Sequence, residues 1–243
     1  MSKYHVATLT WIFACLIAWA LTDTFWGGIA LFTLIYFVAL VWGAIDIQFD
    51  FYLKSQHHLS TKNKEIALTF DDGPHPNTLA VLNVLDKHHA KATFFCIGLQ
   101  IEQYPDILLE IVRRGHQIGN HTYTHKHTFP LFAVHTMEEE IRKTNDLIQK
   151  VTGKTTNLFR PPFGVTNPRI AKAIQNTDMQ SIGWNRRSFD TVATKEEVLN
   201  RTASRAQSGD IVLFHDRLPE AAERLEAFFE KLKYKQFTFC KVA

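Results

Sequence analysis

The sequence predicts an α/β fold, in which a parallel sheet forms a distorted barrel of seven βα units, preceded by a hairpin of two apolar helices. Two observations lead to this prediction. From residue 65 onward, short apolar runs rich in β-branched and aromatic residues alternate with segments of helical periodicity. Before residue 50, two long stretches carry no charged side chain. Strands that alternate with helices specify a parallel sheet, and uncharged stretches of this length are candidates for membrane spans.

The two uncharged stretches are residues 6–21 and 25–45, separated by the polar break Thr22-Asp23-Thr24. A spanning helix needs about 20 apolar residues, so the second stretch is long enough alone. The first is shorter and could instead be a signal peptide, because Ala18-Trp19-Ala20 resembles a cleavage site. We expect residues 1–50 to form a membrane anchor with two transmembrane helices, which makes the protein a multi-pass membrane protein.

Residues 51–64 are polar and short, and we interpret them as a linker that would hold the next domain close to the bilayer. Residues 65–243 are long enough to bury a core of their own. Within them, strands are predicted at 65–71, 92–97, 116–120, 157–160, 180–185, 210–215 and 236–242, and helices at 77–89, 100–114, 136–151, 167–176, 195–207 and 219–233.

Local signals define the ends of two of these helices. Thr136, followed by three glutamates, is predicted as an N-cap, and Gly153 as the terminator of the same helix. Pro168 falls in the first turn of the next helix after Asn167, where its missing N–H costs nothing.

Two adjacent carboxylates, Asp71 and Asp72, stand where the first predicted strand ends, directly before Gly73-Pro74. Gly followed by Pro permits a turn that bends both side chains toward one point. One aspartate could then bind a metal while the other acts on its water. A solvated turn without chemistry is the alternative.

Two histidines, His121 and His125, follow the third predicted strand, on the loop that leaves it. Imidazole nitrogen suits zinc and the other late first-row divalent ions. Most of the 12 histidines are interpreted as linker, surface or neighbouring residues rather than ligands. One carboxylate with two imidazoles leaves a coordination position open for water, which is the pattern of a catalytic metal site.

With these residues in view, the chain resembles the polysaccharide deacetylase family, also called the NodB-homology domain or carbohydrate esterase family 4. The resemblance covers roughly residues 60–243 and rests on five segments in family order. These are Thr69-Phe70-Asp71-Asp72-Gly73-Pro74, His121-Thr122-Tyr123-Thr124-His125, Arg160-Pro161-Pro162-Phe163-Gly164, residues 184–190, and Leu213-Phe214-His215-Asp216. The resemblance implies a distorted (β/α)7 barrel of the NodB-homology type.

The resemblance also implies roles for these residues. Asp72, His121 and His125 would bind a divalent metal, expected to be zinc, with cobalt or nickel as alternatives. Asp71 would be the general base, held by Arg160, and His215 the general acid, oriented by Asp190. A backbone N–H near Tyr123 would help to stabilise the oxyanion. The substrate-binding residues would be Tyr123, Pro162, Phe163, Trp184 and Leu213, although Trp184 could equally be a core residue.

The fourth segment departs from the family pattern. Asp190 is followed by Thr191, where many members carry Trp, and Arg186-Arg187 stand just before it. The departure bears on the assignment of Asp190, which stands next to it in the sequence. It also changes a wall of the expected groove, which favours a substrate other than a long polymer.

The charge distribution leaves the side of the membrane open. Lys3 precedes the first span and Lys54, Lys62 and Lys64 follow the second, so positive-inside counting places the domain in the cytoplasm. Most relatives that modify cell-wall polymers work outside. Residues 54–243 carry a net charge of +5, which tolerates membrane lipid nearby but is too small to indicate nucleic-acid binding.

The function that these expectations imply is hydrolysis of the N-acetyl amide of an amino sugar in a cell-envelope polysaccharide, by a membrane-anchored, metal-dependent carbohydrate deacetylase. One alternative is deformylation or deacetylation of a lipid-linked sugar at the membrane surface. Another is a catalytically silent carbohydrate-binding membrane protein. Ester hydrolysis stays open because the same tetrahedral intermediate serves both bonds. The oligomeric state is not predicted.

Overall fold

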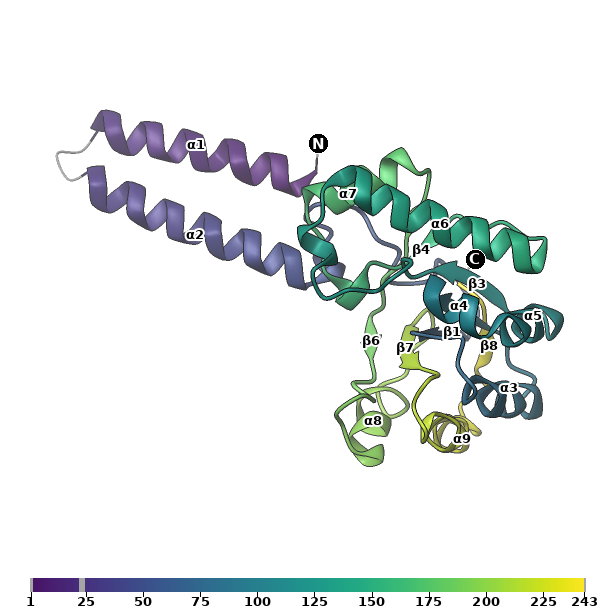
Figure 1. Ribbon diagram of the computed structural model, residues 1–243. Helices are drawn as coiled ribbons and strands as arrows, with labels where there is room; N and C mark the ends of the chain where they lie inside the picture. Colours follow the sequence, from purple (N-terminus) through teal and green to yellow (C-terminus); the bar gives the residue numbers. More distant parts are fainter. Residues whose placement is uncertain (1, 22–24, 243) are drawn as a thin grey trace.

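The computed structural model of the chain describes residues 2–21 and 25–242. The polar break predicted at residues 22–24 lies outside the described residues. Two N-terminal helices, α1 (Lys3–Leu21) and α2 (Phe25–Ile45), lie side by side and project away from the rest of the chain (Figure 1). Most of their large apolar side chains are exposed. By length and composition both helices are candidates for membrane spans, a criterion that a signal sequence also meets.

The end of α2 is fixed to the domain that follows. The N–H of Thr166 donates to the Ala44 carbonyl at 2.9 Å, and the Thr166 hydroxyl donates to the Gly43 carbonyl at 3.0 Å. A short 3-10 helix, η1 (Ile47–Phe49), follows α2, and Ile47 is buried in the domain. The helix pair therefore has a defined attachment rather than a free hinge.

The segment predicted as a linker, residues 51–64, also packs against the domain. The Gln56 N–H donates to the Ser181 carbonyl at 2.9 Å, and the Ser55 and Ser181 hydroxyls are 2.8 Å apart. Leu59 is buried in the same cluster as Ile182. This segment is therefore part of the folded body and not an extended tether.

A curled parallel sheet forms the centre of the domain. Its strands are β1 (Glu65–Asp71), β2 (Ala92–Cys96), β3 (Gln117–Asn120), β4 (Leu158–Phe159), β5 (Gln180–Ser181), β6 (Arg186–Arg187), β7 (Ile211–His215) and β8 (Thr238–Cys240). They run in the order β5-β4-β3-β2-β1-β7-β6, and β8 pairs with the first half of β1. All of these pairings are parallel. The α/β class is confirmed, and the arrangement is consistent with a seven-unit NodB-type fold.

Helices surround the sheet, and α6 and α7 pack together on one side of it (Figure 1). They are α3 (Thr78–Lys87), α4 (Gly98–Gln103), α5 (Pro105–Arg113), α6 (Val134–Thr152), α7 (Pro168–Asn176), α8 (Lys195–Arg201) and α9 (Ala221–Leu232), with 3-10 turns η2 (Phe129–Leu131) and η3 (Pro162–Gly164). Pro168 begins α7 and Gly153 ends α6 in the left-handed region, both as predicted. Asn167 caps α7 by accepting from the Ile170 N–H.

Four predicted boundaries were wrong. The helix predicted at 100–114 is two helices, because Pro105 lacks an N–H and disfavours helical geometry at Tyr104. The strand predicted at 180–185 ends at Ser181, and a separate strand, β6, begins at Arg186 and pairs with β7 instead of β4. The helix predicted at 195–207 ends at Arg201. Thr136 is not an N-cap, since α6 begins at Val134 with Ala133 as its cap.

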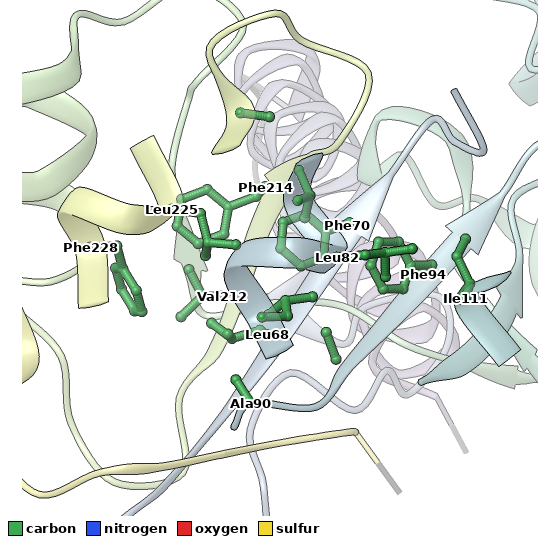
Figure 2. Packing of buried hydrophobic residues seen from close by; sticks show 14 of the residues in the cluster. Leu68, Phe70, Leu82, Ala90, Phe94, Ile111, Val212, Phe214, Leu225 and Phe228 are labelled. Atoms are coloured by element: carbon green, nitrogen blue, oxygen red, sulfur yellow. The ribbon is translucent and has the colours of Figure 1, made fainter. Parts of the chain in front are cut away.

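The core lies on both faces of β1. On one face, Phe70 stacks between Phe94 and Phe214, at ring-centroid distances of 4.9 and 6.0 Å, and Leu82 covers them from α3 (Figure 2). On the other face, a smaller cluster includes Phe95, Trp184 and Leu213. Both faces are buried, so the carboxyl ends of the strands are held by packing against neighbouring elements.

Gly119 in β3 gives a test of this packing. A Cβ at Gly119 would collide with the ring of the buried Phe95 from β2. We expect Gly119→Ala to lower the free energy of unfolding by about 1–3 kcal/mol, the usual effect of overpacking. The measurement is the urea midpoint of the detergent-solubilised chain. Gly27→Ala is the control, because nothing lies within 4 Å of its added Cβ. Equal midpoints for both variants would contradict the packing described.

Candidate active site and metal centre

Four of the predicted site residues lie where strands of the sheet end. Asp71 is the last residue of β1 and His215 the last of β7, while His121 and Arg160 directly follow β3 and β4. These strands belong to one parallel sheet, so their carboxyl ends open at one edge. The fifth, Trp184, was expected at a strand end but lies in the connection between β5 and β6.

The turn after β1 brings both aspartates into the site. Asp72 takes a left-handed backbone conformation, with φ of 75°, and the side chains of Asp71 and Asp72 are only 5% and 11% exposed. A Cβ at Gly73 would collide with the carboxylate of Asp216. The turn therefore needs glycine at this position because a third buried carboxylate packs directly against it.

Three side chains form a group that could hold a metal ion. One donor atom each from Asp72, His121 and His125 lies within 4.8 Å of the others. Asp72 Oδ1 is 3.7 Å from His121 Nε2 and 3.6 Å from His125 Nε2. One carboxylate oxygen and two imidazole nitrogens form a donor set that fits zinc or a similar divalent ion, with a position left for water.

Hydrogen bonding and burial set the orientation and protonation of these metal-binding side chains. His121 Nδ1 lies 2.7 Å from the Arg160 carbonyl, so Nδ1 carries the proton and the Nε2 lone pair faces Asp72. Burial and the neighbouring His121 lower the pKa of His125 to about 4, which keeps that imidazole neutral at pH 7. Burial alone would raise the pKa of Asp72, but His121, His215, His125 and an arginine outweigh it and lower the pKa. Asp72 and His125 are therefore in the protonation state that a metal requires.

Arg160 connects the base candidate to the metal site. Its side chain is fully buried, with the guanidinium carbon 4.1 Å from the centre of the Phe95 ring. Nη1 donates to Asp71 Oδ1 at 2.7 Å, while Nε and Nη2 donate to the carbonyls of Ile182 and Gly183 at 3.1 and 2.8 Å. Asp71 is thereby held with its second oxygen, Oδ2, 3.7 Å from His121 Nε2.

His215 and Asp190 form a second buried pair. His215 Nδ1 is 2.7 Å from Asp190 Oδ1, and the His215 backbone N–H donates to Asp190 Oδ2 at 2.8 Å. Burial disfavours the imidazolium, but the hydrogen bond and charge of Asp190 outweigh it, so the pKa of His215 is raised. Asp190 therefore contacts His215 even though the next residue, Thr191, departs from the family pattern.

Two residues of the site were not predicted from the sequence. Arg217 Nε donates to Asp72 Oδ2 at 2.9 Å, so the two oxygens of Asp72 face an arginine and the histidines respectively. Asp216 is fully buried, and its burial raises the pKa to about 7. Asp216 ends the fifth segment and Arg217 follows it, and this position was the only sequence signal available.

The residues predicted to bind substrate lie in different environments. Phe163 is 37% exposed, with φ of 61°, and its ring centroid is 4.8 Å from that of His125. Tyr123 is half-buried, and its hydroxyl donates to Glu102 at 2.8 Å. Pro162 is buried within η3. Trp184 and Leu213 are buried in the core, which agrees with the alternative interpretation of Trp184 as a core residue. Contact of these two side chains with substrate stays a prediction.

The backbone N–H near Tyr123 that was expected to face an oxyanion is bonded within the protein. The N–H groups of Tyr123 and Thr124 both donate to Glu140 Oε2, at 3.0 and 2.7 Å. Glu140 on α6 therefore accepts from the N–H groups that were expected to stabilise the oxyanion. No local sequence signal indicates this pairing, because 16 residues separate Glu140 from Thr124.

Comparisons with known proteins agree with this geometry. The sequence profile of the Polysaccharide deacetylase family matches residues 58–182. The peptidoglycan-N-acetylmuramic acid deacetylase PdaC of Bacillus subtilis is 30% identical over 188 residues, which cover 74% of this chain and 38% of that protein. A peptidoglycan-N-acetylglucosamine deacetylase of Bacillus cereus is 33% identical, over 74% of this chain and 87% of that protein.

Solved structures give the same result. The structure of PdaC superposes with a TM-score of 0.69 at 30% identity, over 74% of this chain and 89% of that one. A family 4 pseudoenzyme from Bacillus anthracis superposes with a TM-score of 0.70 at 25% identity, over 76% of this chain and 66% of that one. The profile match, the two relatives and the shared fold establish that the chain belongs to the polysaccharide deacetylase family.

Proposed function

We propose that this chain is a membrane-anchored, metal-dependent hydrolase that removes the N-acetyl group from an amino sugar in a cell-envelope polysaccharide. One observation carries the proposal. A three-residue donor set, an arginine-held carboxylate and a carboxylate-held histidine meet at one edge of the sheet. Relatives named for deacetylation of peptidoglycan amino sugars support the substrate class.

The residues divide the chemistry between them. A divalent metal, zinc by preference, held by Asp72, His121 and His125 would act as a Lewis acid and make a water nucleophilic. Asp71, held by Arg160, accepts the proton of the attacking water. His215, protonated and oriented by Asp190, donates a proton to the amine as the carbon–nitrogen bond breaks. Acetate and the free amino sugar are the products.

Phe163 is our candidate for the oxyanion donor in place of the N–H of Tyr123. No hydrogen bond joins the Phe163 N–H to any part of the chain that the structure describes, and its backbone is in the left-handed region. Its ring lies against His125, so its backbone is next to the metal donors. A free N–H beside the reacting carbonyl would stabilise the developing negative charge.

We further propose that residues 1–50 anchor the protein in the membrane and that residues 65–243 form the catalytic domain, with residues 51–64 between them. Two apolar helices with exposed side chains support the anchor. Thr166, which binds the end of α2, follows Gly164 of η3 by two residues. The proposed anchor is therefore adjacent to η3, which carries the proposed substrate-binding residues Pro162 and Phe163. In this proposal the active site lies near the bilayer.

This adjacency also favours a second candidate, a deformylase or deacetylase of a lipid-linked sugar at the membrane surface. A catalytically silent carbohydrate-binding protein is the third, and the pseudoenzyme relative shows that the fold alone does not ensure catalysis. The complete set of donors, base and acid argues against it.

The three candidates are separated by one experiment. The detergent-purified chain is stripped of metal, supplied with zinc, and assayed for acetate and formate release from peptidoglycan fragments, chito-oligomers and polyprenyl-linked amino sugars. Zinc-dependent acetate release from a polymer supports the proposal. Release from the lipid-linked sugar alone supports the second candidate, and no release from any substrate supports the silent protein.

Asp71 is the residue on which the proposed base catalysis depends. We expect Asp71→Asn to lower kcat by about a hundredfold or more, the usual contribution of a general base. Zinc content should stay at the wild-type level because Asp71 lies outside the donor set. Asp146→Asn, on the exposed face of α6, is the control. An Asp71→Asn enzyme with wild-type kcat would exclude the assignment.

The Asp190 pair predicts a change in pH dependence. His215 must be protonated to act as the acid, so activity falls as the pH rises through its pKa. Asp190 raises that pKa. We therefore expect Asp190→Asn to move the alkaline limb of the kcat/KM profile to lower pH, while Asp146→Asn leaves it in place. A profile of the Asp190→Asn enzyme that keeps the wild-type alkaline limb would refute the pairing.

A further inference from the structure

A cavity of about 370 Å³ lies between the end of α2 and the β6 region. Four arginines line it, Arg186, Arg187, Arg201 and Arg205, together with Phe189, Trp184 and residues 45–48. Nothing in the proposed catalytic chemistry uses these arginines. The cavity therefore needs an explanation of its own.

Three of these arginines lack an ion-pair partner among the residues that the structure describes. Arg187, Arg201 and Arg205 are exposed, and none makes an ion pair with a carboxylate of residues 2–21 or 25–242. Only Arg186 is neutralised, by a 2.8 Å bond from its Nε to Asp210 Oδ2. One carboxylate, Asp46, lines the cavity, where it accepts from the Gln48 N–H. The cavity thus keeps an excess of positive charge.

Aromatic rings hold two of the free guanidinium groups. The guanidinium carbons of Arg187 and Arg201 lie 4.7 and 4.8 Å from the centre of the Phe189 ring. Arg187 also lies 5.6 Å from the ring of Trp184. Stacking on aromatic faces restricts the guanidinium and leaves its N–H edge available to an anion. Phe189 is held with φ of 57° directly before Asp190, so the arginines are placed by the same segment that places the acid pair.

The position of the cavity indicates where its anion comes from. Ile45 is the last residue of α2 and also lines the cavity. If α1 and α2 are inserted in a bilayer, as proposed above, the apolar helix ends at the headgroup layer and the arginines lie within it. Phosphate groups are the abundant anions of that layer, and guanidinium binds phosphate with paired hydrogen bonds.

We propose that Arg187, Arg201 and Arg205 form a binding site for the phosphate group of an anionic membrane lipid. This site fixes the domain against the membrane surface, so that the neighbouring active site faces the headgroup layer. The assignment rests on the membrane insertion of α1 and α2, and its ligand chemistry is that of a phosphate ester carried on a lipid.

The test is isothermal titration calorimetry. The full chain, purified in neutral detergent, is titrated with short-chain phosphatidylglycerol, and the dissociation constant is measured. We expect Arg187→Gln/Arg201→Gln to weaken binding by about tenfold or more, because charge-assisted hydrogen bonds to phosphate are lost. Arg142→Gln/Arg169→Gln removes the same charge from exposed positions of α6 and α7 and is expected to bind as the wild type does. Short-chain phosphatidylcholine and inorganic phosphate are the comparison ligands.

Each outcome has a defined meaning. Tighter binding of phosphatidylglycerol than of either comparison ligand, lost only in the Arg187/Arg201 variant, supports the site. Equal loss in both double variants would show diffuse surface charge and overturn it. Inorganic phosphate binding as tightly as the lipid would overturn the lipid assignment. Because calorimetry does not depend on turnover, an inactive chain that still binds the lipid would separate this inference from the proposed function.

Discussion

The site depends on one buried cation, Arg160. Its guanidinium is withdrawn from water among Phe95, two backbone carbonyls and Thr69, and Asp71 is its only carboxylate partner among the described residues. A buried charge that loses its partner costs several kcal/mol, so the fold holds Asp71 and Arg160 together. The same residue's carbonyl fixes the ring of His121. The side chain of Arg160 therefore sets the position of the proposed base, Asp71. The backbone carbonyl of Arg160 sets the orientation of a proposed metal donor, His121.

A second constraint comes from the sheet. β1, β3, β4 and β7 end at one edge, and both faces of β1 are packed with apolar side chains. The functional groups project from the ends of a rigid sheet, so their spacing is set by strand register rather than by loop conformation. His215 pairs with Asp71 in the register of β1 and β7, which places the proposed acid and base on neighbouring strands.

Much of this was predictable from the sequence, because strand ends are marked by residues with strong local preferences. The apolar run before Asp71 and the Gly73-Pro74 turn fixed the position of both aspartates, and the alternation of strands and helices fixed the α/β class. Contacts between distant segments were predictable only where the family resemblance implied them, as for Arg160 with Asp71. The bond from Arg217 to Asp72 spans 145 residues, and Glu140 binds the Tyr123 N–H from another element. The short strand β6 was missed because two arginines do not resemble a strand without the partner β7.

The central claim is that Asp72, His121 and His125 bind a divalent metal while Asp71, held by Arg160, stays outside the coordination shell. Anomalous diffraction at the zinc edge from crystals of the zinc-loaded chain tests it most directly. The account predicts one strong peak bonded to Asp72 Oδ1, His121 Nε2 and His125 Nε2, with Asp71 still paired to Arg160. A peak coordinated by Asp71, or zinc bound only elsewhere in the chain, would contradict it.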